Sequence, residues 1–131
     1  SKHRTFCRHG YYLHREYCAM MPNKKRTLSV ELTTANQDVY TAPASFSGDI
    51  NSIIVSNTSG SSVTFSLDWY DDSATAYHTI AETVTMTPNS ILQITEYPLY
   101  LEKNDKIRGL ASSNSSITVT VSAEERFVPI A

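Results

Sequence analysis

The sequence of 131 residues is the length of a single domain, with 40% hydrophobic residues and a net charge of −2. This composition excludes a chain that is disordered throughout, and no apolar run approaches the roughly 18 residues needed to cross a bilayer as a helix. The first residues are charged rather than apolar, so no secretory signal peptide is expected.

The charges are divided unevenly along the chain. Residues 1–26 hold seven lysines and arginines against one glutamate, a charge of +6, whereas residues 27–131 hold four against twelve acids, a charge of −8. A short cationic segment on an acidic body is typical of a segment that binds a negative surface. Nucleic acid, a neighbouring subunit and another protein all offer such a surface.

From Thr27 onward, apolar and polar residues alternate, which is the pattern of β-strands. Clusters of Asn, Asp, Ser, Gly and Pro separate the alternating segments and favour turns. Strands at a spacing of roughly 8–12 residues with such turns predict an all-β antiparallel sandwich or barrel. In chain order, strands are expected at 28–32, 39–43, 50–56, 63–70, 77–86 with a bend near Ala81 and Glu82, 91–94, 97–101, 106–111 and 117–123.

The clearest alternation lies in the last strand and in the strand that runs from 63 to 70. Their apolar faces are expected to line the core, with the residues Val63, Phe65, Leu67, Trp69, Ile117, Val119 and Val121. The chain therefore divides into a basic N-terminal arm (1–26), a β-sandwich domain (27–126) and an apolar C-terminal tail (127–131). Two interpretations of the tail stay open, packing on the domain and docking on a partner.

The arm contains a duplicated element, His-Arg-x-aromatic-Cys, which ends at Cys7 and again at Cys18. Together with His3 and His14, the two cysteines could form a Cys2His2 zinc site, although each half lacks a known finger spacing. A disulfide between the cysteines would close a short loop and contribute about 3 kcal/mol in an oxidising environment. Two free thiols in an extended arm are the favoured interpretation.

The arm mixes cations with aromatic residues, a combination that suits binding to a partner. The candidate partner-binding residues are Arg4, Phe6, Arg8, Tyr11, Tyr12, Arg15, Tyr17, Lys24, Lys25 and Arg26. Such a segment can track a nucleic-acid backbone and stack on bases. Because the body is acidic and would repel nucleic acid, an acidic protein surface suits the arm at least as well.

No catalytic constellation is found in the body of the chain. His78 is its single histidine and lies in a strand segment, where a structural role is favoured. Asp68, Asp71 and Asp72 lack the Asp-x-Asp-x-Asp-Gly pattern of a calcium loop, and aspartates at a turn usually serve the turn itself. Neither a Gly-x-Ser-x-Gly elbow nor a phosphate-binding loop is present. The sequence thus predicts a protein that is not an enzyme and has no cofactor.

A series of short motifs between residues 27 and 123 resembles small β-sandwich virion proteins of tailed bacteriophages. The motifs are Asp38-Val39-Tyr40-Thr41-Ala42-Pro43, Ile53-Ile54-Val55-Ser56-Asn57-Thr58-Ser59-Gly60 before the Val63–Trp69 strand, Met86-Thr87-Pro88-Asn89-Ser90, and Pro98-Leu99-Tyr100-Leu101-Glu102 with Asp105-Lys106-Ile107. The resemblance lies in the composition of these motifs and in their order along the chain, since none of them is diagnostic alone. Residues 1–20 depart from it.

The resemblance implies a jelly-roll β-sandwich of about eight strands that decorates and stabilises a capsid, or that belongs to a collar or head–tail adaptor. It implies the major capsid protein or other virion proteins as partners, a homo-oligomer such as a trimer or ring, and a place in the virion after assembly in the host cytoplasm. Neither a membrane nor nucleic acid is an expected partner. The arm would provide contacts between subunits.

A carbohydrate-binding adhesin on the same sandwich is the alternative from another class. It would use Trp69, Tyr70 and Tyr77 as platforms for sugar rings. The alternation from Val63 to Trp69 argues against this use of Trp69, because it directs that ring toward the core.

Overall fold

The computed structural model describes residues 4–6, 12–14, 23–94 and 98–129, and all of its regular elements are β-strands. They are β1 (Arg4–Phe6), β2 (Tyr12–His14), β3 (Lys24–Glu31), β4 (Gln37–Thr41), β5 (Phe46–Asn57), β6 (Val63–Asp71), β7 (Ala76–Met86), β8 (Ser90–Ile94), β9 (Leu99–Leu101), β10 (Lys106–Ala111) and β11 (Ile117–Phe127). The described segments thus contain no helix that could span a membrane.

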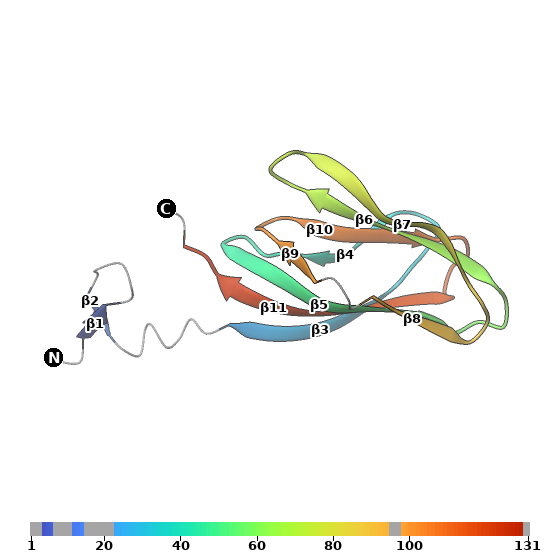
Figure 1. Cartoon of the computed structure of the whole chain (residues 1–131), viewed down its shortest axis with the longest axis horizontal. Coiled ribbons are helices and arrows are strands. Elements are labelled where there is room, and N and C mark those ends of the chain that lie inside the picture. The colour runs from blue at the N-terminus through green and yellow to red at the C-terminus, as the bar shows by residue number, and fades with distance from the viewer. Residues whose placement is uncertain (1–3, 7–11, 15–22, 95–97, 130–131) are drawn as a thin grey trace.

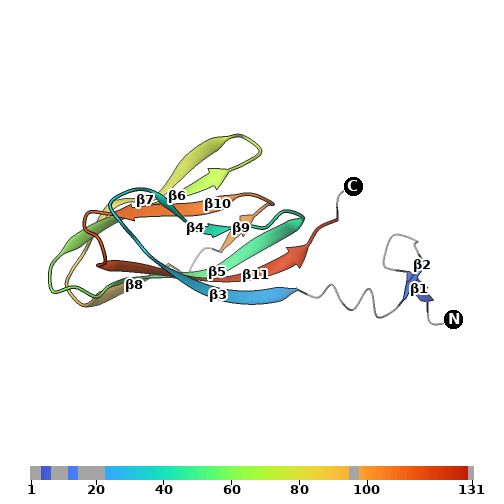
Figure 2. The same cartoon turned by 180° about the vertical axis from the view of Figure 1, so that it is seen from behind.

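Nine of the strands form two sheets that pack face to face (Figures 1 and 2). One sheet has the order β4-β10-β6-β7. The other has the order β3-β11-β5-β8, and β9 pairs with β5 beside β8. Because β8 pairs along residues 53–57 and β9 along residues 48–50, the two short strands act as one interrupted edge strand. The expected antiparallel β-sandwich of about eight strands is confirmed.

The strand pairs show that the chain is folded as one long hairpin. Its first half, β3 to β6, pairs with its second half in reverse order, so that β3 meets β11, β4 meets β10, β5 meets β8 and β9, and β6 meets β7. Rolling such a hairpin into two sheets produces the jelly-roll topology. The strands β3 and β11 are therefore neighbours in the sheet although they are the first and last strands of the domain in sequence.

The core lies between the sheets and is made by every second residue of the long strands. Val63, Phe65 and Leu67 of β6 face Ile117, Val119 and Val121 of β11, and all six side chains are buried. Trp69 also points inward, but it is half-buried and packs against the margin of this cluster. The alternation arises because successive side chains of a strand point to opposite faces.

The pairing of β6 with β7 contains the bend that was expected near Ala81 and Glu82. The register of the two strands shifts on either side of Leu67, which lies opposite Ala81, and Thr83 has a positive φ of 50°. Such a bulge bends an edge strand and disturbs its hydrogen-bonding edge, which discourages unplanned pairing with another chain.

The boundary between arm and domain lies earlier than the sequence indicated. β3 begins at Lys24, so Lys24, Lys25 and Arg26 belong to the sheet rather than to the arm. Lys24 lies opposite Glu125 and Lys25 opposite Glu124 in the register with β11, and opposite charges across a strand pair stabilise it. At the other terminus, β11 continues to Phe127, and the Val128 N–H donates a 2.8 Å hydrogen bond to the Ser45 carbonyl. The tail thus packs on the domain as far as Val128.

Candidate assembly interface

The cations of the sandwich gather at the end where β3 begins and β11 ends, which we call the charged end. Residues 23–94 and 98–129 contain seven lysines and arginines. Six of them, Lys24, Lys25, Arg26, Lys103, Lys106 and Arg126, lie at this end, which is on the left in Figure 1. Arg108 lies one pleat further along β10.

The opposite end, which we call the neutral tip, is formed by the loops 33–36, 58–62, 87–89 and 112–116. Fourteen of these seventeen residues are Ser, Thr or Asn, and none is charged. Charge therefore distinguishes the two ends of one sandwich, and the N-terminal arm joins the domain at the charged one.

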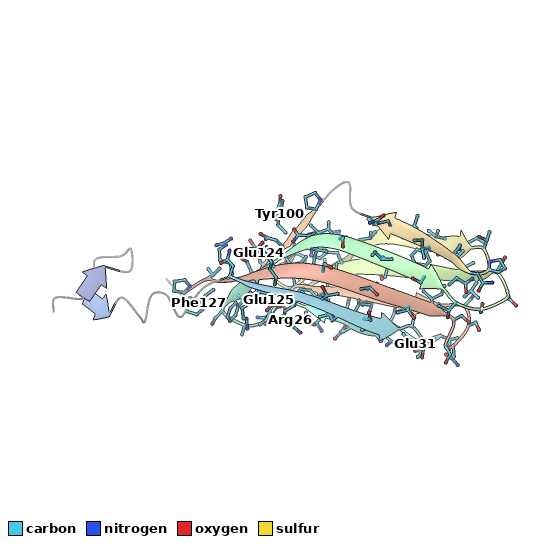
Figure 3. All side chains as sticks on the ribbon, turned by 90° about the horizontal axis from the view of Figure 1, so that it is seen from below. Arg26, Glu31, Tyr100, Glu124, Glu125 and Phe127 are labelled. Atoms are coloured by element: carbon cyan, nitrogen blue, oxygen red, sulfur yellow. The ribbon has the colours of Figure 1, made fainter. Side chains whose placement is uncertain are left out.

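A buried ion pair ties β3 to β11 at the charged end (Figure 3). The side chain of Glu125 is fully buried, and its Oε2 accepts hydrogen bonds from Arg26 Nη1 at 2.9 Å and from the Tyr40 hydroxyl at 2.7 Å. Burial, together with the hydrogen bond to Glu125 and its negative charge, raises the pKa of Tyr40 well above its usual value. The Arg26 side chain is nearly half exposed, so this pair connects the interior to the surface.

Gly48 makes room for the Tyr40 ring in this network. A Cβ at position 48 would come within 2.5 Å of the Tyr40 hydroxyl oxygen. A larger residue at this position would therefore displace the hydroxyl that holds Glu125.

Three buried polar atoms have no hydrogen-bond partner in the described part of the chain, namely Ser47 Oγ, Trp69 Nε1 and Glu125 Oε1. They belong to the start of β5, the end of β6 and the end of β11, so all three lie at the charged end. Buried polar groups in native proteins are nearly always paired. The charged end thus keeps hydrogen-bonding capacity that the described residues do not use.

A groove of about 460 Å³ lies at the same end, between the loop before β5, the turn before β10 and the C-terminal segment. It is lined by Ser45, Phe46, Ser47, Glu102, Lys103, Arg126, Val128 and Pro129. Phe46 forms one wall, where its ring packs edge-on against Phe127 at 5.7 Å and lies under Lys24 Nζ at 5.1 Å. The apolar walls of the groove, with Lys103 and Arg126 against the single acid Glu102, suit a peptide segment that carries apolar and acidic residues.

Asp105 fixes the turns around this end. It is buried, and its two carboxylate oxygens accept hydrogen bonds from the backbone N–H groups of Asp72 at 2.9 Å and Glu102 at 3.0 Å. The Ala42 N–H donates to its carbonyl oxygen at 2.9 Å. One residue thereby joins three connections, two through its side chain and one through its backbone, which keeps the surface of the charged end in a defined shape.

The interrupted strand beside β5 exposes apolar side chains. Ile91 of β8 and Tyr100 of β9 are each 71% exposed, and Leu92 is also exposed. An exposed apolar edge strand is a template for pairing with another chain unless a partner covers it. This edge is a second surface through which the domain can contact a neighbour.

The residues expected to bind partners do not form one group in the structure. Lys24, Lys25 and Arg26 lie on β3, as described above. β1 and β2 form a two-stranded antiparallel sheet in which Arg4 lies opposite His14 and Phe6 opposite Tyr12. The remaining members of the arm lie outside the described residues: His3, Cys7, Arg8, Tyr11, Arg15, Tyr17 and Cys18. The zinc and disulfide interpretations concern these residues, and the described residues contain no cluster of three metal-binding side chains.

Of the three aromatic residues considered as sugar platforms, two share a surface. Tyr70 and Tyr77 lie directly opposite each other on the outer face of the four-stranded sheet. Trp69 points to the other face, where its ring stacks on His78 at 4.9 Å.

Sequence patterns alone predicted no role in a site for Glu125, Tyr40, Gly48 or Asp105. For Glu125 a signal existed, because it continues the inward-facing series Val119, Val121, Ala123 and should therefore be buried. A carboxylate at an inward position of an alternating strand predicts a buried partner of opposite charge. The other three act through contacts between distant segments, which local patterns do not show.

Searches with the sequence found neither a family model nor a curated protein that matches it. A solved structure shares its architecture at low sequence identity. A subunit of Bacillus endospore appendages, a family of disulfide-linked pili, has 11% identity and a TM-score of 0.50 over 83% of this chain and 89% of its own. This likeness establishes a common fold and nothing about function.

Two phage capsid structures are also among the structural neighbours. A pentameric capsid protein from metagenomic phage sequences has 12% identity and a TM-score of 0.38 over 77% of this chain and 61% of its own. A chain of the cyanophage Pam1 capsid has 18% identity and a TM-score of 0.34 over 83% of this chain and 85% of its own. Scores this low establish neither a family nor a role.

Proposed function

We propose that the protein is a structural component of a bacteriophage virion that acts by binding rather than catalysis, as a decoration or cement protein on the capsid surface. The observation that carries this proposal is the construction of the charged end. Cations and a groove gather where the basic arm joins the domain. The motifs that resemble small phage virion proteins point to the virion as the assembly in which the protein acts. The use of jelly rolls in other capsids supports the proposal as an analogy of fold.

The arm would contact neighbouring copies of the protein. Residues 1–23 carry four cations against one acid, a charge of +3, whereas residues 24–131 of a neighbour carry seven cations against twelve acids, a charge of −5. Attraction between arm and neighbouring domain would guide assembly and weaken at high salt. On a symmetric shell many such weak contacts act together, which makes the binding of each copy stronger than one contact allows.

The first test is to find the protein in particles of the phage whose genome encodes it. Virions purified on a density gradient should contain the chain by mass spectrometry, and a cryo-electron microscopy map should show its density on the outer surface. Absence from purified virions would contradict the proposal. The number of copies per particle distinguishes a decoration protein from a collar or adaptor component, because a decoration protein covers the shell, whereas a collar or adaptor forms one ring.

The second test concerns the interface. Particles prepared without the protein should retain the added wild-type chain through a gradient, and the variant Lys103→Glu/Arg126→Glu should lose about tenfold in apparent affinity through charge repulsion. Ser62→Glu/Ser113→Glu is the control, because it also lowers the net charge but at exposed positions of the neutral tip, away from the charged end. Equal loss in both variants would show that net charge, and not the charged end, governs binding. Removal of residues 1–22 measures the contribution of the arm in the same assay.

A further inference from the structure

The outer face of the four-stranded sheet contains an ordered group of aromatic and charged side chains, which we call the tyrosine platform. Its members are Tyr70, Tyr77, Asp68 and Arg108. The rings of Tyr70 and Tyr77 are 4.6 Å apart, and the Arg108 guanidinium lies 3.5 Å from the centre of the Tyr77 ring. Tyr77 nevertheless remains 46% exposed. An aromatic ring that is held by two neighbours and is still nearly half exposed is suited to contact a ligand.

Arg108 is held in place by a second contact. Its Nε donates a hydrogen bond of 3.2 Å to Asp68 Oδ2, and both side chains are partly buried. The guanidinium is thus fixed between a carboxylate and an aromatic ring, an arrangement that Arg forms better than Lys because it is planar. The platform is therefore organised before any ligand binds, which lowers the entropic cost of binding.

A groove of about 230 Å³ lies on the same face of the sheet. Its walls carry the polar side chains of Asn36, Ser66, Asp68, Thr79 and Glu82, and Ala81 and Leu110 contribute apolar surface. Asp68 belongs to both the groove and the platform, which makes the two surfaces continuous. The groove offers hydroxyl, amide and carboxylate groups, so it can both donate and accept hydrogen bonds.

The charges on this face indicate the class of ligand. Arg108 and Asp68 neutralise each other, as do Asp38 and Lys106, whose Nζ lies 5.6 Å from the centre of the Tyr70 ring. The remaining charge in the groove is the carboxylate of Glu82. Nucleic acid and acidic glycans would be repelled by this carboxylate, whereas a neutral ligand with many hydroxyl groups can hydrogen-bond to it. A pyranose ring also presents an apolar face that packs on tyrosine. We propose that this face of the sheet binds a neutral carbohydrate, a binding activity beyond the proposed role in the virion.

The orientation of Trp69 agrees with this assignment. The ring lies on the inner face of β6 and stacks on His78 of β7, directly opposite it in the register. It therefore does not contact a ligand on the outer face, but it holds together the two strands that carry Tyr70 and Tyr77.

The experiment screens the full chain on an array of neutral and acidic glycans, and the best-retained neutral oligosaccharide is then titrated by calorimetry. Tyr77→Ala should weaken binding about tenfold, the size of effect expected for a lost stacking contact. Asn36→Ala should weaken it about threefold through a lost hydrogen bond. Asn36 lies in an exposed loop, so this variant keeps the fold even where Tyr77→Ala does not.

Tyr100→Ala is the matched control, because Tyr100 is an exposed tyrosine on the other sheet, and its affinity should stay within about twofold of wild type. Retention of no neutral glycan by the wild-type chain would overturn the inference. A preference for acidic glycans, or equal losses in Tyr77→Ala and Tyr100→Ala, would overturn it as well. Retention on capsids, measured in parallel, should be the same for Tyr77→Ala and wild type, so failure of this inference is distinct from failure of the virion role.

Discussion

The charged end and the neutral tip of the sandwich are both organised by a buried polar side chain, but they satisfy their hydrogen bonds differently. At the neutral tip, the Asn57 amide donates to the carbonyl oxygens of Ser61, Met86 and Thr87 and accepts from the backbone and hydroxyl of Ser59. At the charged end, Glu125 uses one carboxylate oxygen twice and leaves the other without a partner among the described residues.

The two ends therefore differ in whether all of their buried polar side-chain groups are paired. An amide can donate and accept, so Asn57 completes the tip with groups of the chain itself. Carboxylates only accept, and the buried acids of the charged end depend on donors that other segments bring to them. The tip therefore pairs its buried amide within one chain, whereas the charged end keeps a buried carboxylate oxygen that the described residues leave unpaired.

Asn57→Ala should have the largest effect, because it would open the neutral tip. The change removes the side-chain partner of the Ser59 N–H and of the Met86 carbonyl, and each buried group left unpaired costs about 1–3 kcal/mol. The carbonyls of Ser61 and Thr87 keep hydrogen bonds from Ser59 Oγ and Ser90 Oγ. We expect the free energy of unfolding to fall by about 3–4 kcal/mol, measured by urea denaturation. Ser62→Ala, at an exposed position of the same loop, should change it by less than about 0.5 kcal/mol. Similar losses in both variants would show that the loop, and not the amide, stabilises the tip.

Glu125→Ala should have the second largest effect. It removes the acceptor of the Tyr40 hydroxyl and of Arg26 and leaves a small cavity, so we expect a loss of about 2–3 kcal/mol in the same measurement. The loss should be smaller than for an isolated buried ion pair, because Arg26 is nearly half exposed and can return to water. Glu124→Ala is the control on the same strand, facing outward, and should cost less than about 1 kcal/mol. Equal costs would contradict the role of the buried pair.

Gly48→Ala tests the close approach of Tyr40 to the backbone of β5. We expect a loss of about 1–2 kcal/mol from overpacking, because the new Cβ would meet the hydroxyl oxygen. In the double variant with Tyr40→Phe, the two effects should not add, since the group that clashes is absent. Additive effects would show that the cost of Gly48→Ala arises from a contact other than the one with the Tyr40 hydroxyl.

Tyr40→Phe should have the smallest effect at neutral pH, about 1 kcal/mol for one hydrogen bond. Its effect should depend on pH, because the folded protein raises the pKa of Tyr40 above the unfolded value of 10.0. Wild-type stability from this group is complete below pH 10 and is lost as the pH rises further, by about 1.4 kcal/mol per pH unit. The advantage of wild type over Tyr40→Phe should therefore shrink above pH 10 in urea titrations, and a constant difference would contradict the shift.

The contrast between the ends also shows what a sequence can reveal. Alternation located the strands because the burial of one face is a local property of a strand, as in Val63, Phe65 and Leu67. Lys24 to Arg26 precede the alternation that begins at Thr27, so the sequence places them in the arm, whereas their pairing with β11 joins segments about a hundred residues apart. Loops were recognised as turns, but nothing local shows that Asn57 or Asp105 binds a second loop.

The candidate sites differ in the same way. Tyr70 and Tyr77 could be recognised as exposed aromatics, but Arg108 joins them only through the sheet order, in which β10 lies beside β6. The charged end follows from the closing of the long hairpin, which brings the first and last strands of the domain together. Contacts that depend on the pairing of distant strands thus escaped prediction from local patterns.

The pairing of β3 with β11 also determines where a fused protein or an inserted peptide would lie on the domain. Chain segments before Lys24 and after Phe127 emerge side by side, so a protein fused to either side would extend from the charged end. The neutral tip then faces away from the anchored side. An added Cβ at Gly60 would meet nothing within 4 Å, so a peptide inserted there would project into open space. A shell coated through its charged ends would display such a peptide at every copy.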